Sequence, residues 1–229
     1  MVTPSGLARA LAAAGGPGRL LSPAERVALD ALALERRRRD WLAGRLAAKR
    51  AVRAVARAAG EAAPPWPTIS VLNAPDGAPY FVVDGRPELA EAWNISIAHD
   101  DGFAACAIAC SARDGQVGVD LERDRPLAPD LLRYVLTDGE RRRLHGGVRG
   151  DAPPPLAIWT AKEAVVKAGR GGVCAAMRQV ELSWTDRRVL LARVVAREGT
   201  TRAPELRVAC APLGAHLLAW ATCRMPEAA

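Results

Sequence analysis

Two short motifs carry the residue types that could do chemistry in this chain. A Gly-Val-Asp-Leu-Glu segment places Asp120 and Glu122 two residues apart, which on a β-strand puts both carboxylates on one face. A Trp-Thr-Ala-Lys-Glu-Ala-Val-Val-Lys segment places Glu163 and Lys167 four apart, one turn along one face of a helix. Three carboxylates and an amine that converge are suited to hold a divalent cation such as Mg²⁺ on a phosphate group.

Each pair also has a simpler interpretation. Asp120 and Glu122 could be solvated acids at a strand end, and Glu163 with Lys167 could form a surface ion pair worth about 0.3–0.5 kcal/mol. Two observations favour chemistry. The residues that alternate with the two acids are apolar, so one face of the strand carries both carboxylates. Of the 32 Lys and Arg residues only three are Lys, all within two helical motifs, and Lys can release a proton where Arg cannot.

A second group of residues could bind phosphate. Arg45 and Lys49 lie four apart on a basic helix beside an apolar stripe, although such basic runs are more often a solvated face. His99 follows an apolar strand and precedes an Asp-Asp-Gly turn signal. It could be an ordinary turn residue, or it could donate a hydrogen bond to a phosphate from either ring nitrogen.

Composition limits the class of protein. The 229 residues are 50% hydrophobic, enough for a sizeable core, and the net charge of +7 favours acidic partners: nucleic acid, nucleotide phosphates or an acidic protein. Five cysteines without a CxxC pair indicate a reducing compartment, and three histidines are too few for a zinc cluster. No apolar run approaches a membrane span, and no signal peptide is evident, so a soluble cytoplasmic protein is expected.

Local signals predict helices and strands in a definite order. Two capping boxes, Ser22–Glu25 and Thr137–Glu140, each open a helical region, and the first region runs to about Ala59 before a proline-rich stretch. A third helix is expected from about Leu156 to Ala168. Strands are expected at residues 69–72, 80–83, 94–98, 103–110, 116–122, 180–184, 189–195, 205–211 and 216–223.

The chain also hints at an internal repeat. Trp41 and Lys49 have the same eight-residue separation as Trp159 and Lys167, and Arg45 would then correspond to Glu163. Each half would consist of one long helix against a small, mostly antiparallel sheet. The alternative is chance similarity in an alanine-rich chain.

Four segments, taken in order, resemble the 4′-phosphopantetheinyl transferases: residues 41–49, 95–99, 118–122 and 159–167. Their order and wide spacing are similar to the large surfactin-type branch, over nearly the whole chain. The resemblance implies an α+β fold built as a pseudo-twofold pair of subdomains, each with a long helix packed on a small, mostly antiparallel sheet. The expected subdomains are residues 1–112, with the basic helix and the His99 turn, and residues 113–229, with the acids and the Lys167 helix.

The resemblance also implies a reaction and a set of roles. Such an enzyme, a holo-[acyl-carrier-protein] synthase, moves 4′-phosphopantetheine from coenzyme A to a serine of an acyl or peptidyl carrier protein and releases adenosine 3′,5′-bisphosphate. Asp120, Glu122 and Glu163 would hold Mg²⁺. Glu163, Lys167 and Asp120 would be catalytic: Glu163 could take the serine proton, directly or through water, and Lys167 would stabilise the departing phosphate. The residues expected to bind coenzyme A are Arg45, His99, Lys162 and Lys167.

The chain departs from the family pattern at two places. Ala98 stands where the family often has Ser. A Gly-Lys/Arg-Pro element usually precedes the histidine, and both Gly77-Ala-Pro79 and Gly85-Arg-Pro87 are candidates, which leaves Arg86 open as a coenzyme A ligand.

The expected partner is an acidic carrier protein of fatty acid, polyketide or nonribosomal peptide synthesis, with the enzyme a monomer. One alternative is another Mg²⁺-dependent phosphoryl or nucleotidyl transferase that uses the same acids. A basic nucleic-acid-binding module is the other alternative, which the 4% of aromatic residues and the lack of a known motif disfavour.

Overall fold

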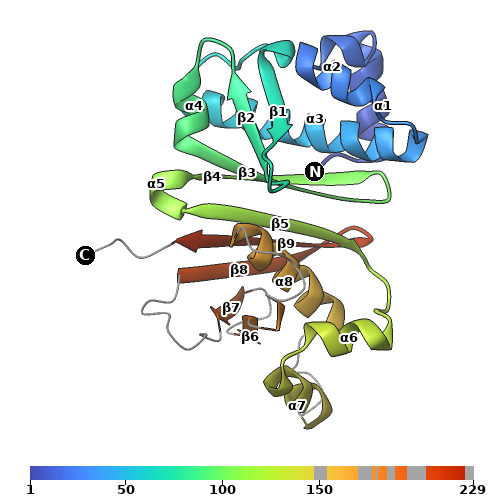
Figure 1. Ribbon diagram of the computed structural model, residues 1–229, viewed down its shortest axis with the longest axis vertical. Coiled ribbons are helices and arrows are strands. Elements are labelled where there is room, and N and C mark those ends of the chain that lie inside the picture. Colours follow the sequence, from blue (N-terminus) through green and yellow to red (C-terminus); the bar gives the residue numbers. More distant parts are fainter. Residues whose placement is uncertain (147–153, 170–176, 179, 185–188, 195–204, 225–229) are drawn as a thin grey trace. The chain divides into compact units, whose positions relative to one another are not determined.

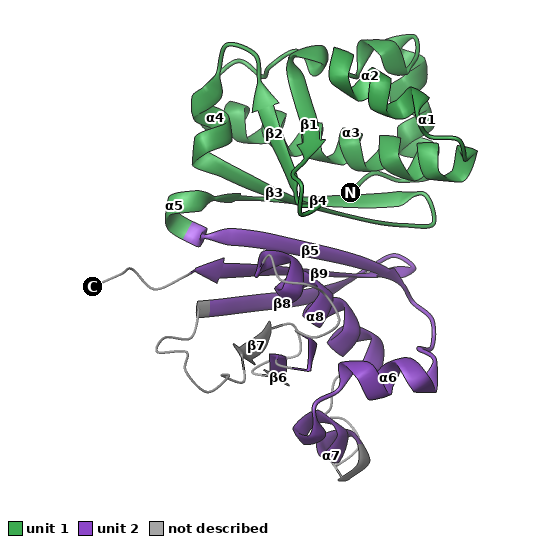
Figure 2. Cartoon of the chain, in the orientation of Figure 1, with its two compact units in different colours: residues 1–113 green, residues 114–229 purple. Residues whose placement is uncertain are grey.

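The computed structural model describes residues 1–146, 154–169, 177–178, 180–184, 189–194 and 205–224 (Figure 1). The chain forms two compact units, residues 1–113 (unit 1) and 114–229 (unit 2), coloured separately in Figure 2. Both units combine helices with small antiparallel sheets, so the predicted α+β class is confirmed. Within the described ranges no helix is long and apolar enough to cross a membrane. The four cysteines in these ranges form no disulfide, and Cys174 lies outside them.

Unit 1 packs helices against two β-hairpins. Its helices are α1 (Pro4–Ala14), α2 (Pro23–Asp30), α3 (Glu35–Ala58) and α4 (Pro87–Ala92), with short 3₁₀ turns η1 (Pro17–Arg19) and η2 (Trp66–Thr68). Its hairpins are β1 (Ile69–Asn73) with β2 (Pro79–Val83), and β3 (Trp93–Asp100) with β4 (Phe103–Cys110). The short helix α5 (Ser111–Asp114) follows β4.

The 24-residue helix α3 is the centre of unit 1 because its small residues allow close packing. Ala48 and Val52 lie in one core cluster with β1, β2 and α4, and Ala43 and Ala47 lie in another with α1 and β4. A Cβ on Gly44 would stand 3.1 Å from Cγ2 of Ile97 on β3, so the helix approaches the hairpin closely there.

The β3–β4 hairpin turn fixes the position of His99. Asp101 and Gly102 both have positive φ, 48° and 80°, the conformation of a two-residue type I′ turn. The Gly102 amide donates to Oδ1 of Asp40 on α3 at 2.9 Å. The turn, and His99 just before it, are therefore attached to the first half of α3.

Unit 2 contains one five-stranded antiparallel sheet in the order β5-β9-β8-β7-β6. The strands are β5 (Gln116–Arg123), β6 (Val180–Trp184), β7 (Val189–Val194), β8 (Glu205–Leu213) and β9 (His216–Arg224). The helices are α6 (Pro129–Val135), α7 (Asp138–Gly146) and α8 (Pro155–Ala168). Helix α8 packs on β5, β8 and β9, where its alanines and valines form the core with residues such as Val208 and Ala219.

Gly118 allows α8 to lie directly on β5. A Cβ at this position would stand 1.9 Å from the Ala164 carbonyl oxygen and 2.5 Å from the Ala168 nitrogen, both backbone atoms of α8. Only a residue without a side chain fits. Asp120 and Glu122 follow at two-residue intervals on the same face of the strand, so this close approach brings them under the helix that carries Glu163 and Lys167.

Most predicted elements are confirmed at nearly their predicted limits. Both capping boxes form, at the starts of α2 and α7. The strands agree within a few residues, apart from residue 195, which lies outside the described ranges. Helices α1, α4 and α6 were not predicted. All three begin with a proline, and α1 also has an N-cap at Thr3 and a glycine C-cap at Gly15, so signals for them are present in the sequence.

Candidate active site

The acid pair of β5 meets the basic end of α8. Lys167 Nζ donates to Oδ1 of Asp120 at 2.6 Å, an ion pair in which the Asp120 side chain is buried and the lysine is partly exposed. The two residues are 47 positions apart in sequence. The structure therefore brings together the strand motif and the helix motif.

Glu122 is held by a residue whose role the sequence analysis did not identify. Trp159 Nε1, one turn before Glu163 on α8, donates to Oε1 of Glu122 at 2.8 Å. In the sequence this tryptophan only marks the start of the helix motif. A single indole donor at this spacing has no sequence signal of its own, because the bond depends on how α8 crosses β5.

The pKa of Glu163 is affected by the charges of both other acids. Burial first of all, together with the negative charges of Asp120 and Glu122, raises the pKa of Glu163 from 4.5 to about 7, with Lys167 opposing the shift. Glu163 therefore lies within electrostatic range of two other carboxylates and of one lysine.

The donor types of this cluster fit a hard cation such as Mg²⁺, which binds carboxylate oxygens. A divalent ion would also neutralise the charge that raises the pKa of Glu163. In the part of the chain that the structure describes, however, no three His, Cys, Asp or Glu side chains are gathered as metal ligands. Lys167 donates to one oxygen of Asp120, and Trp159 donates to one oxygen of Glu122.

A second candidate site lies within unit 1. A pocket of about 330 Å³ opens between the N-terminal half of α3 and β3. Basic side chains from both elements line it, together with apolar residues. The lining residues are Leu34, Arg36, Arg37, Asp40, Trp41, Gly44, Arg45, Ile97 and His99. The structure therefore brings Arg45 and His99 to one pocket.

Arg45 is the buried cation of this pocket, with 8% of its surface exposed. Its guanidinium lies 4.6 Å from the centre of the Trp41 ring and donates from Nη2 to Oδ1 of Asn73 at 2.6 Å. Among the described residues, its Nε has no hydrogen-bond partner although it is buried. Burial lowers the pKa of Arg45, but a guanidinium stays charged in proteins. The side chain is fixed in place and retains a donor.

Asn73 links one of the two Gly-x-Pro segments to Arg45. Its Nδ2 donates to the Gly77 carbonyl at 2.8 Å, so the Gly77-Ala-Pro79 turn is joined to Arg45 through one side chain. Arg86 of the other segment forms ion pairs with Glu61 and Glu88 instead. We therefore do not assign Arg86 to the pocket.

Lys162, expected to bind coenzyme A, lies inside unit 2 and is fully buried. Its ammonium donates to Glu140 Oε2 and to the backbone carbonyls of Val135 and Met177. An ammonium has three hydrogens, and three acceptors use them all. Lys49, which looked suited to phosphate beside Arg45, is 1% exposed and equally enclosed. Neither lysine has a donor left for a phosphate.

A comparison with protein families finds a match within unit 2. The model of the 4′-phosphopantetheinyl transferase superfamily matches residues 116–219, just under half of the chain. The match agrees with the superfamily that the motifs resemble, and residues 116–219 of unit 2 are similar to domains of this superfamily. The matched segment includes Asp120, Glu122, Glu163 and Lys167. No curated protein compared with the chain matches it.

Proposed function

We propose that this protein transfers 4′-phosphopantetheine from coenzyme A to a serine of an acyl or peptidyl carrier protein, with Mg²⁺ as cofactor. One observation carries the proposal: a buried aspartate paired with a lysine lies within electrostatic range of two further carboxylates where α8 packs on β5, inside the segment that the superfamily model matches. Transfer of a phosphate-linked group needs positioning and charge neutralisation more than covalent help, and such a cluster supplies both.

Coenzyme A binding is assigned to the unit 1 pocket. The cofactor carries several phosphates, and Arg45 offers a fixed, buried donor beside the exposed Arg36 and Arg37. His99 adds a ring nitrogen from the other side of the pocket. An arginine already held by Trp41 and Asn73 loses little rotamer freedom when it binds a phosphate.

The unit 2 cluster is assigned the chemical step. Asp120, Glu122 and Glu163 would hold Mg²⁺, which would supply charge neutralisation at the pyrophosphate of coenzyme A. Lys167 would stabilise the negative charge of the departing phosphate. Glu163 would accept the serine proton directly or through water. Trp159 would keep Glu122 in position.

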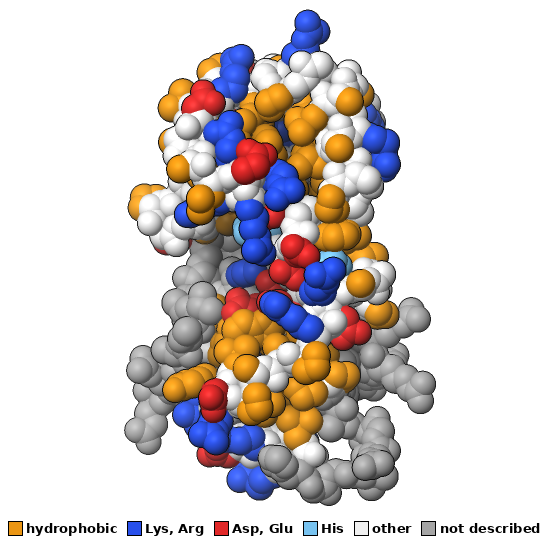
Figure 3. All heavy atoms as spheres, turned by 90° about the vertical axis from the view of Figure 1, so that its right-hand side faces the viewer, with side chains coloured by type: hydrophobic (Ala, Val, Ile, Leu, Met, Phe, Trp, Pro, Cys, Tyr) orange, Lys and Arg blue, Asp and Glu red, His pale blue; other side chains and the backbone are white. Residues whose placement is uncertain are grey.

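The further details of the proposal follow from charge and chain content. An acidic carrier protein suits a chain with a net charge of +7. On the sides of the two units that Figure 3 presents, basic side chains are interspersed with acidic and apolar ones. Since one chain holds both a phosphate pocket and an acidic cluster, we propose a monomer of the surfactin-type branch. The described cysteines form no disulfide, which suits a reducing compartment, and we propose a cytoplasmic location.

The test is mass spectrometry of an apo carrier protein incubated with the protein, coenzyme A and Mg²⁺. We expect a gain of one phosphopantetheine per carrier. Asp120→Asn and Glu163→Gln should abolish the gain while the variants stay folded. Asp130→Asn, an exposed acid at the start of α6, is the matched control and should transfer normally. Normal transfer by both site variants would remove the assigned roles.

Thermal melts separate the alternatives. Coenzyme A with Mg²⁺ should raise the melting temperature, because a ligand that binds only the folded protein stabilises it. Stabilisation by nucleoside triphosphates and not by coenzyme A would favour a different phosphoryl or nucleotidyl transferase. Duplex binding with a steep salt dependence, and no effect of coenzyme A, would favour a nucleic-acid-binding module.

A further inference from the structure

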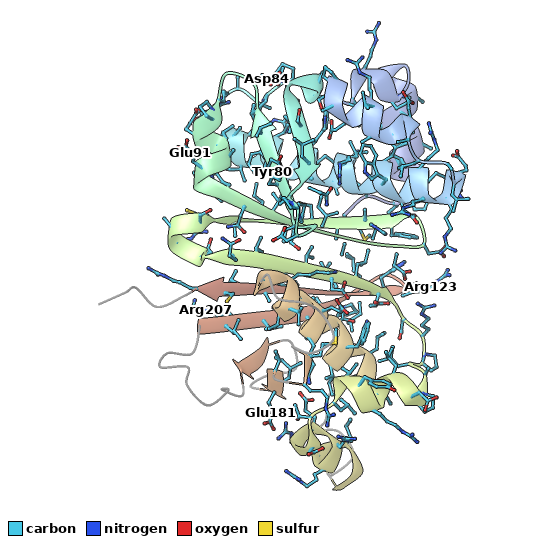
Figure 4. The ribbon with its side chains drawn as sticks, viewed as in Figure 1. Tyr80, Asp84, Glu91, Arg123, Glu181 and Arg207 are labelled. Atoms are coloured by element: carbon cyan, nitrogen blue, oxygen red, sulfur yellow. The ribbon has the colours of Figure 1, made fainter. Side chains whose placement is uncertain are left out.

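Glu140 joins three elements of unit 2 inside the protein. Its Oε2 accepts hydrogen bonds from the Thr137 amide at 2.8 Å and from Lys162 Nζ at 2.6 Å. Its Oε1 accepts from the Leu182 amide at 2.9 Å. One carboxylate therefore connects the start of α7, the middle of α8 and strand β6. Arg143 of α7 adds an ion pair to Glu181 of β6 at the surface, next to α7 in Figure 4.

Glu25 joins three elements of unit 1 in the same way. Its Oε2 accepts from the Ser22 amide at 2.8 Å and from Lys49 Nζ at 2.6 Å, and its Oε1 accepts from the Val71 amide at 3.1 Å. The start of α2, the middle of α3 and strand β1 are thus joined by one buried carboxylate.

The two lysines complete the same arrangement. Lys49 also donates to the Leu20 carbonyl at 2.7 Å and to the Trp66 carbonyl at 2.9 Å. Lys162 also donates to the Val135 carbonyl at 2.7 Å and to the Met177 carbonyl, just before β6, at 3.1 Å. The spacings are the same in both units. One carbonyl (Leu20 or Val135) lies two residues before the helix-capping residue, and the other (Trp66 or Met177) lies five residues before the strand amide that donates to the glutamate. We name these sets the Glu25–Lys49 clamp and the Glu140–Lys162 clamp.

We propose that the two clamps are positioning devices for the two functional helices. The Glu140–Lys162 clamp fixes α8, on which Glu163 follows Lys162 directly. The Glu25–Lys49 clamp fixes α3, on which Arg45 lies one turn before Lys49. The inference rests on the proposed function, because it assigns Glu163 to the chemical step and Arg45 to coenzyme A. In each unit the helix that presents the functional residue is the helix that carries the buried lysine.

The physical reason is the cost of moving a buried ion pair. An ammonium enclosed by three acceptors cannot shift by an ångström without losing hydrogen bonds in a low-dielectric interior, where an unsatisfied charge is very unfavourable. An apolar contact between the same helices would allow small slides and rotations at little cost. The clamps therefore set the register of α8 and α3 more sharply than hydrophobic packing alone.

The two clamps serve as controls for each other. The singles are Glu140→Gln and Lys162→Met in unit 2, with Glu25→Gln and Lys49→Met in unit 1. Each unit also receives its double variant, which leaves no buried charge unpaired and keeps the comparison possible where a single variant does not fold. Melting temperature, kcat and the KM for coenzyme A are measured for all six variants with saturating carrier and Mg²⁺.

We expect the kinetic effects to divide by unit. The unit 2 variants should lower kcat by between about tenfold and about 10²-fold, with a KM for coenzyme A near that of the wild type, because the reacting groups are misplaced. The unit 1 variants should raise the KM for coenzyme A with kcat nearly unchanged. The double variants should have higher melting temperatures than the single variants. They should still lower kcat in unit 2 and raise the KM for coenzyme A in unit 1.

Three outcomes would overturn the inference. Folded variants with unchanged kcat and KM would make the clamps purely structural. Losses that do not differ between units would remove the link to a particular helix. A KM increase for Lys162→Met without a fall in kcat would make Lys162 a ligand. If the wild-type protein modifies no carrier, the proposed function fails. If the wild type transfers and the variants transfer equally well, only the positioning inference fails.

Discussion

Gly118→Ala tests whether the contact between β5 and α8 builds the acidic cluster. The added Cβ would stand 1.9 Å from the Ala164 carbonyl oxygen and 2.5 Å from the Ala168 nitrogen. Ordinary contacts of a Cβ begin near 3.4 Å. Backbone atoms cannot turn away as a flexible side chain can, so the helix must move from the strand by about 1.5 Å in a closely packed interior.

This displacement has two measurable consequences. The 2.6 Å bond between Lys167 and Asp120 would be stretched beyond hydrogen-bonding range, and a misplacement of about 1 Å can lower a rate by about 10²-fold. Overpacking costs about 1–3 kcal/mol, and we expect the upper end because the obstacle is backbone. For a chain of this size each kcal/mol lowers the melting temperature by about 2–4 °C.

The assay compares transfer rate and melting temperature with a control variant from the same helix. Gly169→Ala follows the last turn of α8, where the nearest atom to a new Cβ is 3.5 Å away, and it should behave as wild type. Gly118→Ala with wild-type stability and rate would refute the reasoning. The helix would then have an easy route around the added methyl group.

Three further predictions concern single side chains. Because burial and neighbouring acids raise the pKa of Glu163 from 4.5 to about 7, the folded protein binds this proton more tightly than the unfolded chain. In chelator the wild type should therefore lose stability relative to Glu163→Gln as the pH rises from 4.5 through 7, and melts that stay parallel would contradict this. Trp159→Phe keeps the ring but removes the donor to Glu122, so transfer should require more Mg²⁺; an unchanged Mg²⁺ titration would argue against positioning. Arg45→Lys, which loses the planar fork, should raise the KM for coenzyme A and leave kcat near wild type in steady-state kinetics.

Local signals explain why the sequence predicts so much of the fold. Each capping box needs only residues three apart, and a strand such as β5 shows its own alternation of apolar and acidic residues, so neither signal depends on distant contacts. The approach of Asp120 to Lys167 could also be predicted, because the spacing of each motif places its charged residues on one face of the strand or helix. The bonds of Trp159 and Asn73 could not, since they depend on the angle at which distant elements cross.

The burial of Lys162 shows where the reasoning from motifs fell short. Helical residues five apart point about 140° away from each other, so Lys162 and Lys167 cannot both face one site. The five-residue spacing can be read from the sequence, and only the resemblance to the family placed both lysines among the coenzyme A ligands. Lys49 was misjudged for a related reason: lying four residues from Arg45 shows a shared face, but not how deeply each side chain is buried.

The scarcity of lysine finds a physical explanation in the two clamps. A chain with 32 Lys and Arg residues uses lysine only three times, and two of the three have an ammonium enclosed by one carboxylate and two carbonyls. Three donors meet three acceptors, whereas a guanidinium would bring five donors in a rigid plane and leave some unsatisfied. The third lysine, Lys167, lies partly exposed on Asp120, where a compact charge can move to a phosphate without breaking the core. Lysine therefore stands at the positions where a small charge is required, and arginine serves elsewhere.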